Sequence, residues 1–531
     1  MARALVLGLG ESGLAMARWL ARDGWELTVA DTRAAPPALD ALRAALPQAR
    51  FVGAALAAGA AEGLLEDAAL VALSPGLSPR ADGVRELLAA AGRRAVECLG
   101  EIELFARALA ALRAERGYAP ALLGVTGTNG KTTTVRMAGR MIERSGRSVV
   151  VAGNVSPSAL DALRVALEAR ALPEVWVLEL SSFQLAATRS LACTAAALLN
   201  VTEDHLDWHA DMADYLASKR RIFGPATVQV LDRDEEPTRS LAREAAAQSR
   251  VLTFGRSAPA APGQYGLVRE GGLTWLACTD EEDAPRRRRR APRAAAAAPA
   301  PADAVGAAAA LAADPPPGAA AEAPRVHRLM PLDALAVRGT HNALNALAAL
   351  ALVRAIGVPL APALHALQEF QADPHRTQSV ARIGDVEYID DSKGTNVGAT
   401  IAALRGLADE PGAARRIVLI LGGDGKGQSF APLAEAVRAH ARAVVLIGRD
   451  APRIEEALHG IDLPLRHAAD LAAAVGAAAA LARPGDRVLL SPACASFDMF
   501  RDYAHRAQAF VAAVRALAPA AAGDAPAEGP A

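Results

Sequence analysis

The sequence has few cysteines, few aromatic residues and almost no net charge, and each shortage excludes a class of protein. Four cysteines in 531 residues form no C-x-x-C pair. This argues against a disulfide scaffold or a zinc framework and favours reduced thiols in a cytoplasmic protein. Aromatic residues make up 4% of the chain, and the formal net charge is −1. A net charge this close to zero provides no overall attraction to nucleic acid or to an anionic membrane.

Long apolar runs and a targeting segment are also missing. The best apolar stretch, residues 471–482, is too short and too rich in alanine to span a bilayer. The first residues lead directly into a predicted strand and lack the length and flanks of a signal peptide. We therefore expect neither membrane insertion nor nucleic-acid binding.

The length and the order of local signals predict three α/β domains. A chain of this length exceeds one hydrophobic core, and domains usually have about 100–200 residues. Strand and helix patterns alternate, which is typical of parallel sheets covered by helices. We predict a Rossmann-like domain over 1–117, a central P-loop domain with a parallel sheet over 118–372, and a Rossmann-like C-terminal domain over 373–531.

Two segments differ in composition from these domains. Residues 281–324 hold five consecutive arginines followed by alanine and proline, and we predict a disordered surface insertion. A nucleic-acid-binding arm is the alternative, but no aromatic residues lie between the arginines to stack on bases. Residues 519–531 are rich in Ala, Pro and Gly and are predicted to form a frayed tail.

The most informative stretch is Gly-Val-Thr-Gly-Thr-Asn-Gly-Lys-Thr-Thr-Thr at 124–134, between an apolar run and a helical pattern. A glycine turn in this position directs backbone N–H groups toward phosphate oxygens. Lys131 supplies a charge for the terminal phosphates, and Thr132 supplies a hydroxyl for magnesium. The spacing departs from the usual P-loop, because Val125 stands five residues before Gly130. The stretch predicts use of a nucleoside triphosphate.

A second glycine pattern, Gly8-x-Gly10-x-x-Gly13, also lies between a predicted strand and a predicted helix. Asp31 follows about 20 residues later, at the end of the next strand, as in dinucleotide-binding folds. Two other interpretations remain: a tight turn without a ligand, and a P-loop regulator whose first domain binds NAD.

Polar side chains follow other predicted strands of the central domain. Glu179 ends one strand, where a carboxylate suits magnesium. After another strand, a cluster of acids and histidines favours a second part of the same site. It consists of Glu203, Asp204, His205, Asp207 and His209. Spacing alone would make Lys219 an exposed helix lysine.

Three polar loops follow strands in the C-terminal domain, at 390–396, 422–427 and 491–496. Ligands of open α/β sheets bind at the carboxyl ends of strands. The Lys, Thr and Ser groups in these loops suit a substrate that bears a carboxylate. Taken singly, each loop could instead be a solvent-exposed connection, but three such loops together favour a site.

The order of these motifs resembles the Mur ligase family from residue 1 to about 515, apart from the insertion. The matching motifs are GTNGKTT (127–133), ELSSFQL (179–185), NVTEDHLD (200–207), GTHNALN (339–345), PHR (374–376), DDSKGTN (390–396), GGDGK (422–426) and SPACASFD (491–498). The P-loop variant is shared with that family and with folylpolyglutamate synthetases. SSFQ, DSKGTN and SPACAS resemble the family member that adds D-glutamate.

The resemblance implies a reaction in peptidoglycan precursor synthesis in the cytoplasm. ATP phosphorylates the carboxylate of UDP-MurNAc-L-Ala, and the amine of D-glutamate attacks the acyl phosphate to form an amide. It also implies two magnesium ions, a monomer, and a third domain that swings inward when ATP binds. Phosphoryl transfer depends on positioning and charge neutralisation. The rival within the family is a ligase that adds a different amino acid.

The resemblance also implies roles for individual residues, with Lys131, Glu179, His205 and Lys219 central to catalysis. The triphosphate contacts are Gly127, Thr128, Asn129, Gly130, Lys131, Thr132 and Thr133. The metal ligands are Thr132, Glu179, His205 and Lys219, the last as a carbamate. The other nucleotide contacts are Asn342, Asn345, Arg376 and Asp391. The UDP-substrate contacts are Ser12, Asp31, Thr32, Ser74, Gly76 and Asn154. The D-glutamate contacts are Thr395, Lys426 and Ser496, with Tyr503 beside them where the family often has phenylalanine.

Overall fold

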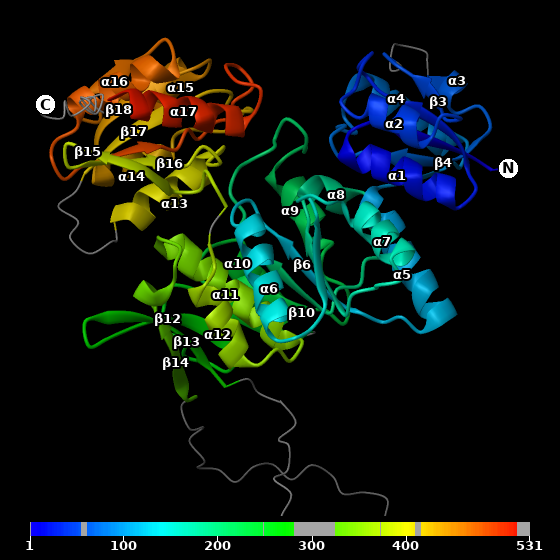
Figure 1. The fold of residues 1–531 in the computed structure, drawn as a ribbon, viewed down its shortest axis with the longest axis horizontal. Coiled ribbons are helices and arrows are strands. Elements are labelled where there is room, and N and C mark those ends of the chain that lie inside the picture. Colours follow the sequence, from blue (N-terminus) through cyan, green and yellow to red (C-terminus); the bar gives the residue numbers. More distant parts are fainter. Residues whose placement is uncertain are drawn as a thin grey trace, which may run out of the picture.

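Three α/β domains make up the chain (Figure 1), which confirms the predicted fold class. The computed structural model describes residues 2–54, 61–247, 249–280, 324–371, 373–408 and 416–517. The predicted insertion lies outside the described residues except for its last residue, and the predicted tail lies wholly outside them. In Figure 1 the middle domain lies between the N-terminal domain on the right and the C-terminal domain on the left.

The N-terminal domain is a five-stranded parallel sheet in the order β3-β2-β1-β4-β5. Its strands are β1 (Arg3–Leu7), β2 (Glu26–Ala30), β3 (Arg50–Val52), β4 (Ala68–Leu73) and β5 (Glu97–Leu99). Its helices are α1 (Glu11–Arg22), α2 (Leu39–Ala45), α3 (Ala61–Leu64) and α4 (Asp82–Arg93), and α5 (Glu101–Arg116) leads into the next domain. The apolar strands β1 and β4 are buried at the centre, as expected for a sheet covered on both faces.

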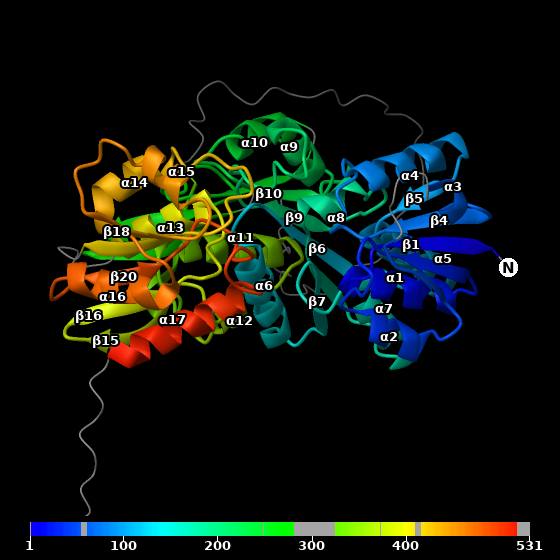
Figure 2. The same ribbon diagram turned by 90° about the horizontal axis from the view of Figure 1, so that it is seen from above.

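A shared hydrophobic core joins the N-terminal domain to the middle domain. Helices α1 and α5 pack against α7 (Ala159–Glu168), as the view from above shows (Figure 2). Leu20, Phe105, Leu160 and Trp176 belong to one continuous cluster of buried residues. The rings of Phe105 and Trp176 meet edge to face with centroids 5.2 Å apart. Separating these two domains would therefore expose a large apolar surface to water.

The middle domain contains a nine-stranded sheet in the order β14-β13-β12-β11-β10-β9-β6-β8-β7. Its strands are β6 (Ala121–Thr126), β7 (Val149–Gly153), β8 (Val175–Glu179), β9 (Ala195–Leu198), β10 (Val228–Asp232), β11 (Val251–Phe254), β12 (Gln264–Glu270), β13 (Leu273–Thr279) and β14 (Val326–Pro331). Besides α7, its helices are α6 (Lys131–Arg144), α8 (Ser182–Ala186), α9 (Met212–Arg220), α10 (Thr238–Ala245), η1 (Leu332–Ala334), α11 (Thr340–Ala355) and α12 (Leu360–Gln368).

One edge of this sheet departs from the predicted parallel arrangement. β13 runs antiparallel to both β12 and β14. Gly271 and Gly272 separate β12 from β13, and both have positive φ (60° and 79°). Two consecutive residues with positive φ form the tight turn that joins antiparallel strands. The Gly-Gly pair was the available sequence signal, and the prediction overlooked it.

The C-terminal domain contains a six-stranded sheet in the order β15-β16-β20-β17-β18-β19. Its strands are β15 (Gln378–Ile383), β16 (Val386–Asp390), β17 (Ile417–Gly422), β18 (Ala441–Ile447), β19 (Leu465–His467) and β20 (Arg487–Leu490). Its helices are α13 (Val397–Ala408), α14 (Leu433–His440), α15 (Ala451–Ala457), α16 (Leu471–Leu481) and α17 (Tyr503–Leu517). Only β15 is antiparallel, and the turn before β16 again has two residues with positive φ, Gly384 and Asp385.

This domain has its own hydrophobic cores on the two faces of its sheet. Polar pairs connect it to the middle domain, including an ion pair between Lys426 and Asp204 and another between Arg338 and Glu387. Among the described residues, no helix has both the length and the apolar character that crossing a bilayer requires.

We predict that Phe105→Ala lowers the free energy of unfolding by about 3–5 kcal/mol, the usual cost of removing a buried phenylalanine ring. Phe105 is 0% exposed and packs on Trp176 at the junction of two domains. Urea-induced unfolding followed by tryptophan fluorescence measures the loss.

Val165→Ala is the control, because Val165 is 53% exposed on α7, and we expect a change within about 0.5 kcal/mol. A loss below about 1 kcal/mol in Phe105→Ala would contradict a continuous core.

Candidate active site

The P-loop connects the buried strand β6 to α6 at the carboxyl edge of the middle sheet. Gly127 (φ 147°) and Gly130 (φ 85°) occupy backbone conformations that favour glycine. A Cβ atom on Gly130 would lie 2.3 Å from Asn345 Oδ1, so glycine is also required for space. Asn200 supports the loop from the end of β9, because its Oδ1 accepts a 2.8 Å hydrogen bond from the Asn129 N–H.

A half-buried lysine and a buried lysine meet at the first glycine of this loop. Lys131 Nζ donates to Gly127 O at 2.9 Å and to Thr128 O at 2.8 Å. Lys219 Nζ, from α9, donates to the same Gly127 O at 2.9 Å and lies 4.4 Å from the centroid of the Tyr215 ring. Burial lowers the pKa of Lys131 and lowers that of Lys219 well below its usual value. Lys219 is 1% exposed, so the exposed position that its spacing suggested is wrong.

Glu179 and His205 offer the atoms that a magnesium ion requires. Glu179 Oε1 accepts a 2.8 Å hydrogen bond from Asn154 Nδ2, whereas Glu179 Oε2 is buried without a partner. Burial lowers the pKa of His205 to about 4, which leaves its ring neutral. No three His, Cys, Asp or Glu side chains within the described ranges converge into a complete metal cage. Because Mg²⁺ usually combines one or two carboxylates with phosphate oxygens and water, these residues fit it.

A cavity of about 400 Å³ contains most of the predicted phosphate and metal residues. Lys131, Thr132 and Glu179 line one side, and Arg376 and Thr395 from the C-terminal domain line the other. Thr128, Asn129, Gly130, Asn154, His205 and Tyr503 also line it. The structure thus brings together residues that the sequence separates by more than 350 positions.

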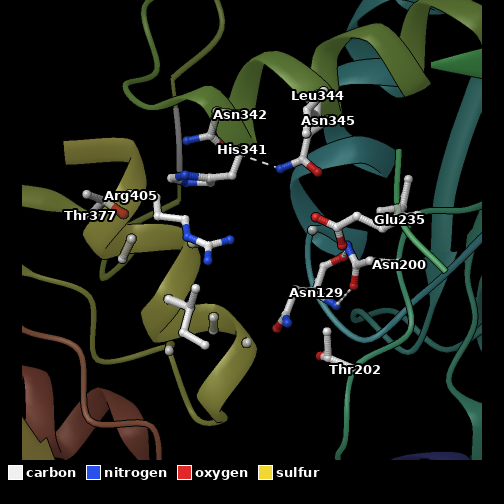
Figure 3. A pocket seen from close by; sticks show the side chains of 18 of the residues that line it. Asn129, Asn200, Thr202, Glu235, His341, Asn342, Leu344, Asn345, Thr377 and Arg405 are labelled. Atoms are coloured by element: carbon white, nitrogen blue, oxygen red, sulfur yellow. Dashed lines mark hydrogen bonds between the residues drawn. The ribbon is translucent and has the colours of Figure 1, made fainter. Parts of the chain in front are cut away.

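A second cavity of about 650 Å³ adjoins the first, since Asn129, Gly130, Arg376 and Lys393 line both. Figure 3 shows Asn342 and Asn345 of α11 facing this space, with Arg405 of α13 across from them. Asn345 Nδ2 donates to Asn342 Oδ1 at 3.2 Å. The predicted residues Thr133 and Asp391 also line it.

Several residues of the second cavity were missed by sequence reasoning. Asp232 and Phe254 end β10 and β11, so the strand-end rule could have found them. Burial raises the pKa of Asp232 to about 7. Glu235, Arg256, Arg405, Glu435 and Arg438 also line the cavity. Arg405 and Glu435 come from helix faces of the C-terminal domain, and no local sequence pattern marks them.

Asp391 does more than line the second cavity, because it is also hydrogen-bonded within the C-terminal domain. Its carboxylate accepts hydrogen bonds from Ser491 Oγ (2.7 Å) and from the Thr377 N–H (3.1 Å). Burial raises its pKa to about 7, against the effect of these donors. Asp391 therefore connects the loops after β16 and β20 as well as lining the cavity.

The predicted D-glutamate residues lie in the C-terminal domain, but not all face the first cavity. Thr395 lines it, and Tyr503 lies there with Lys393 Nζ 3.9 Å from the centroid of its ring. Ser496 is 3% exposed, in the loop after β20. Lys426 Nζ forms a 2.7 Å ion pair with Asp204 of the middle domain.

The predicted UDP-substrate residues of the N-terminal domain gather at the carboxyl ends of β1, β2 and β4, apart from the two cavities, whereas Asn154 follows β7 and lines the first cavity. Asp31 is buried and accepts hydrogen bonds from the Leu9 N–H (2.7 Å) and from the Arg33 side chain. Although burial works against it, these donors lower the pKa of Asp31 to about 2. Asp31 thus fixes the glycine turn. The other members are Ser12, which is half-buried, Ser74, which is buried, and Thr32 and Gly76, which are exposed.

Family models match most of the chain. A Mur ligase MurD-like N-terminal domain matches residues 2–100, a Mur ligase middle domain matches 125–272, and a Mur ligase glutamate ligase domain matches 375–494. These matches follow the order of the three domains in the structure.

Curated relatives are similar over nearly the whole length. A UDP-N-acetylmuramoylalanine–D-glutamate ligase of Ralstonia nicotianae is 54% identical over 516 residues, and one of Burkholderia pseudomallei strain 668 is 55% identical, each covering 97% of both chains. Among solved structures, MurC of Thermotoga maritima covers 97% of this chain and 99% of its own, with a TM-score of 0.53 and 19% identity. MurF of the same organism covers 96% and 97%, with a TM-score of 0.54 and 15% identity. These two show the fold alone.

We predict that protonation of His341, beside the second cavity, destabilises the protein in acid. Burial lowers its folded-state pKa to about 4 from an ordinary 6.5. Between these values the unfolded chain binds the proton more readily, so stability falls as pH falls from 6.5 to 4. The slope from one group is at most about 1.4 kcal/mol per pH unit.

His341→Gln should therefore show a shallower fall in unfolding free energy over this range, measured by urea unfolding at each pH. His459→Gln, an exposed histidine, should keep the parent slope. Equal slopes in the parent and His341→Gln would contradict a neutral buried ring.

Proposed function

The chain belongs to the Mur ligase family, and from this premise we propose that it joins D-glutamate to UDP-N-acetylmuramoyl-L-alanine at the expense of ATP. The observation that carries the proposal is 54–55% identity to D-glutamate ligases across 97% of both chains. We place the reaction in the cytoplasmic synthesis of peptidoglycan precursors.

The chemistry requires activation of a carboxylate. A free carboxylate is a poor acyl donor because its leaving group would be an oxide, so phosphorylation must precede attack by the amine. We assign the nucleoside to the larger cavity and the phosphates to the smaller one, since Asn129, Gly130, Arg376 and Lys393 line both. Lys131 then neutralises charge on the transferred phosphoryl group.

Thr132, Glu179 and His205 would hold magnesium beside the phosphates. The buried, unpartnered Oε2 of Glu179 supports this assignment. When bound, the ion supplies positive charge to the phosphate oxygens. Asn154 holds the other Glu179 oxygen and so orients the carboxylate.

We assign Lys219 as a carbamylated ligand for a second ion. Carbamate formation needs a neutral amine to attack carbon dioxide, and burial lowers the pKa of Lys219. The modification would replace a buried cation beside Lys131 with an anion, which would relieve the like-charge contact that now lowers that pKa further.

The remaining assignments are part of the same proposal. Ser12, Asp31, Thr32, Ser74, Gly76 and Asn154 are assigned to the UDP substrate, with the diphosphate at the N-terminus of α1. Thr395, Lys426, Ser496 and Tyr503 are assigned to D-glutamate. We further propose that the protein acts as a monomer.

The test is phosphate release from ATP with each substrate present or withheld. The proposal expects release only with both UDP-N-acetylmuramoyl-L-alanine and D-glutamate. Release without an acceptor amine would favour a nucleotide-hydrolysing regulator instead. A preference for L-alanine, L-lysine or D-alanyl-D-alanine over D-glutamate would favour another ligase of the family.

We predict that Lys131→Ala lowers kcat/KM by about a hundredfold to a thousandfold or more, the range for loss of one preorganised charge at a reacting centre. Nucleotide binding should weaken as well, which isothermal titration measures. Arg140→Ala, on the exposed face of the same helix, is the control and should keep the parent rate. An unchanged ligase rate in Lys131→Ala would refute the P-loop assignment.

We predict that Lys219→Ala is nearly inactive and that a short carboxylic acid in the buffer restores part of its rate. The acid would occupy the space of the missing carbamate and return an anionic ligand. Arg220→Ala, whose ion pair with Glu244 is exposed, should be active and insensitive to the acid. Full activity of Lys219→Ala without any acid would remove the carbamate assignment.

A further inference from the structure

We propose that Asp204 sets the affinity for D-glutamate by competing with it for the ammonium group of Lys426. With ATP bound and no amino acid present, Asp204 holds the C-terminal domain against the P-loop through this ion pair. It releases Lys426 to a carboxylate of the incoming substrate. The inference rests on the proposed function, which assigns Lys426 to D-glutamate.

Asp204 contacts the C-terminal domain through both of its carboxylate oxygens. Oδ1 accepts from Lys426 Nζ at 2.7 Å, and Oδ2 accepts from Asn396 Nδ2 at 3.1 Å. Asn396 also exchanges two hydrogen bonds with the side chain of Asn129 in the P-loop (3.0 and 3.2 Å). One carboxylate thus connects two loops of the C-terminal domain to the phosphate-binding turn.

The ion pair is shielded from water, so its attraction is weakly screened. The side chains of Lys426 and Asp204 are 16% and 6% exposed. Although burial works to raise it, the neighbouring Lys426 holds the pKa of Asp204 below its usual value.

The backbone around Lys426 is fixed, so its ammonium is the part that can change partner. Lys426 has a positive φ of 50°, and its N–H donates to Asp424 Oδ1 at 3.0 Å. The adjacent Gly425 N–H donates to Asp450 Oδ2 at 2.7 Å. Because the turn is rigid and the four-carbon side chain is flexible, the Lys426 ammonium can pair either with Asp204 or with a carboxylate of D-glutamate.

Asp204 acts as a positioning residue, because it reaches the reacting groups through others. Its Oδ1 also accepts from the His205 N–H at 3.0 Å, so it supports the turn that carries a proposed metal ligand. Replacement by asparagine retains an oxygen for this bond and removes the charge that holds Lys426.

The experiment compares Asp204→Asn with the parent enzyme in steady-state kinetics and in small-angle scattering with ATP present and D-glutamate absent. We expect KM for D-glutamate to fall about fivefold, equivalent to about 1 kcal/mol, with KM for ATP unchanged. We also expect a larger radius of gyration, because the C-terminal domain loses an ion pair to the middle domain.

Asp211→Asn is the matched control, since Asp211 is an exposed aspartate seven positions along the chain that caps α9, and asparagine caps a helix equally well. It should keep the parent KM and radius. If Asp204→Asn does not fold, Asp204→Ser provides the same readouts in the same direction, because serine also removes the charge that holds Lys426 and keeps an oxygen that can accept a hydrogen bond.

An unchanged or raised KM for D-glutamate, or an unchanged radius, would overturn the competition. Failure of the proposed function is a different result, because the parent enzyme itself would then form no amide from D-glutamate.

Discussion

Two lysine side chains from different helices share one backbone carbonyl, and the rest of the site is arranged around this contact. Lys131, which is half-buried, and Lys219, which is buried, both donate to Gly127 O. Burying two ammonium groups side by side is unfavourable unless anions arrive to balance them. The P-loop amides, the strand-end carboxylate Glu179 and the cations Arg376 and Lys393 surround the place where such anions would lie. The protein therefore contains a site whose charge balance depends on phosphate.

The three domains contact one another through two different kinds of interface. The N-terminal and middle domains share a continuous apolar core, which fixes the glycine turn of the N-terminal domain relative to the P-loop. The C-terminal domain has separate cores and contacts the P-loop mainly through polar pairs. A charged side chain at an interface can leave its polar partner for a charged ligand at little cost in free energy. Apolar surfaces that are packed together have no such alternative partner. Substrates bound at this interface are therefore able to influence how the C-terminal domain is held.

Much of this arrangement could be predicted from local sequence, because parallel sheets place their strand ends at one edge. Lys131, Glu179 and His205 were found from strand ends and motif spacing, and the structure brings all three to one cavity. Lys219 was not recoverable from spacing, because its burial depends on a helix packing beneath the P-loop. The sequence marked Asp204 only as a member of an acidic cluster. Its ion pair with Lys426 could not be predicted, because the two residues are 222 positions apart. The antiparallel edge strands were missed although Gly271-Gly272 and Gly384-Asp385 encode both turns.

The terminal phosphate of ATP is proposed to activate a carboxylate of the substrate. The most direct test uses UDP-N-acetylmuramoyl-L-alanine labelled with oxygen-18 in the alanine carboxylate, with mass analysis of the phosphate released during amide formation. Attack of the carboxylate on the terminal phosphate and later departure of that phosphate would transfer one labelled oxygen to each phosphate. Phosphate without the label, formed at the rate of the amide, would contradict the account.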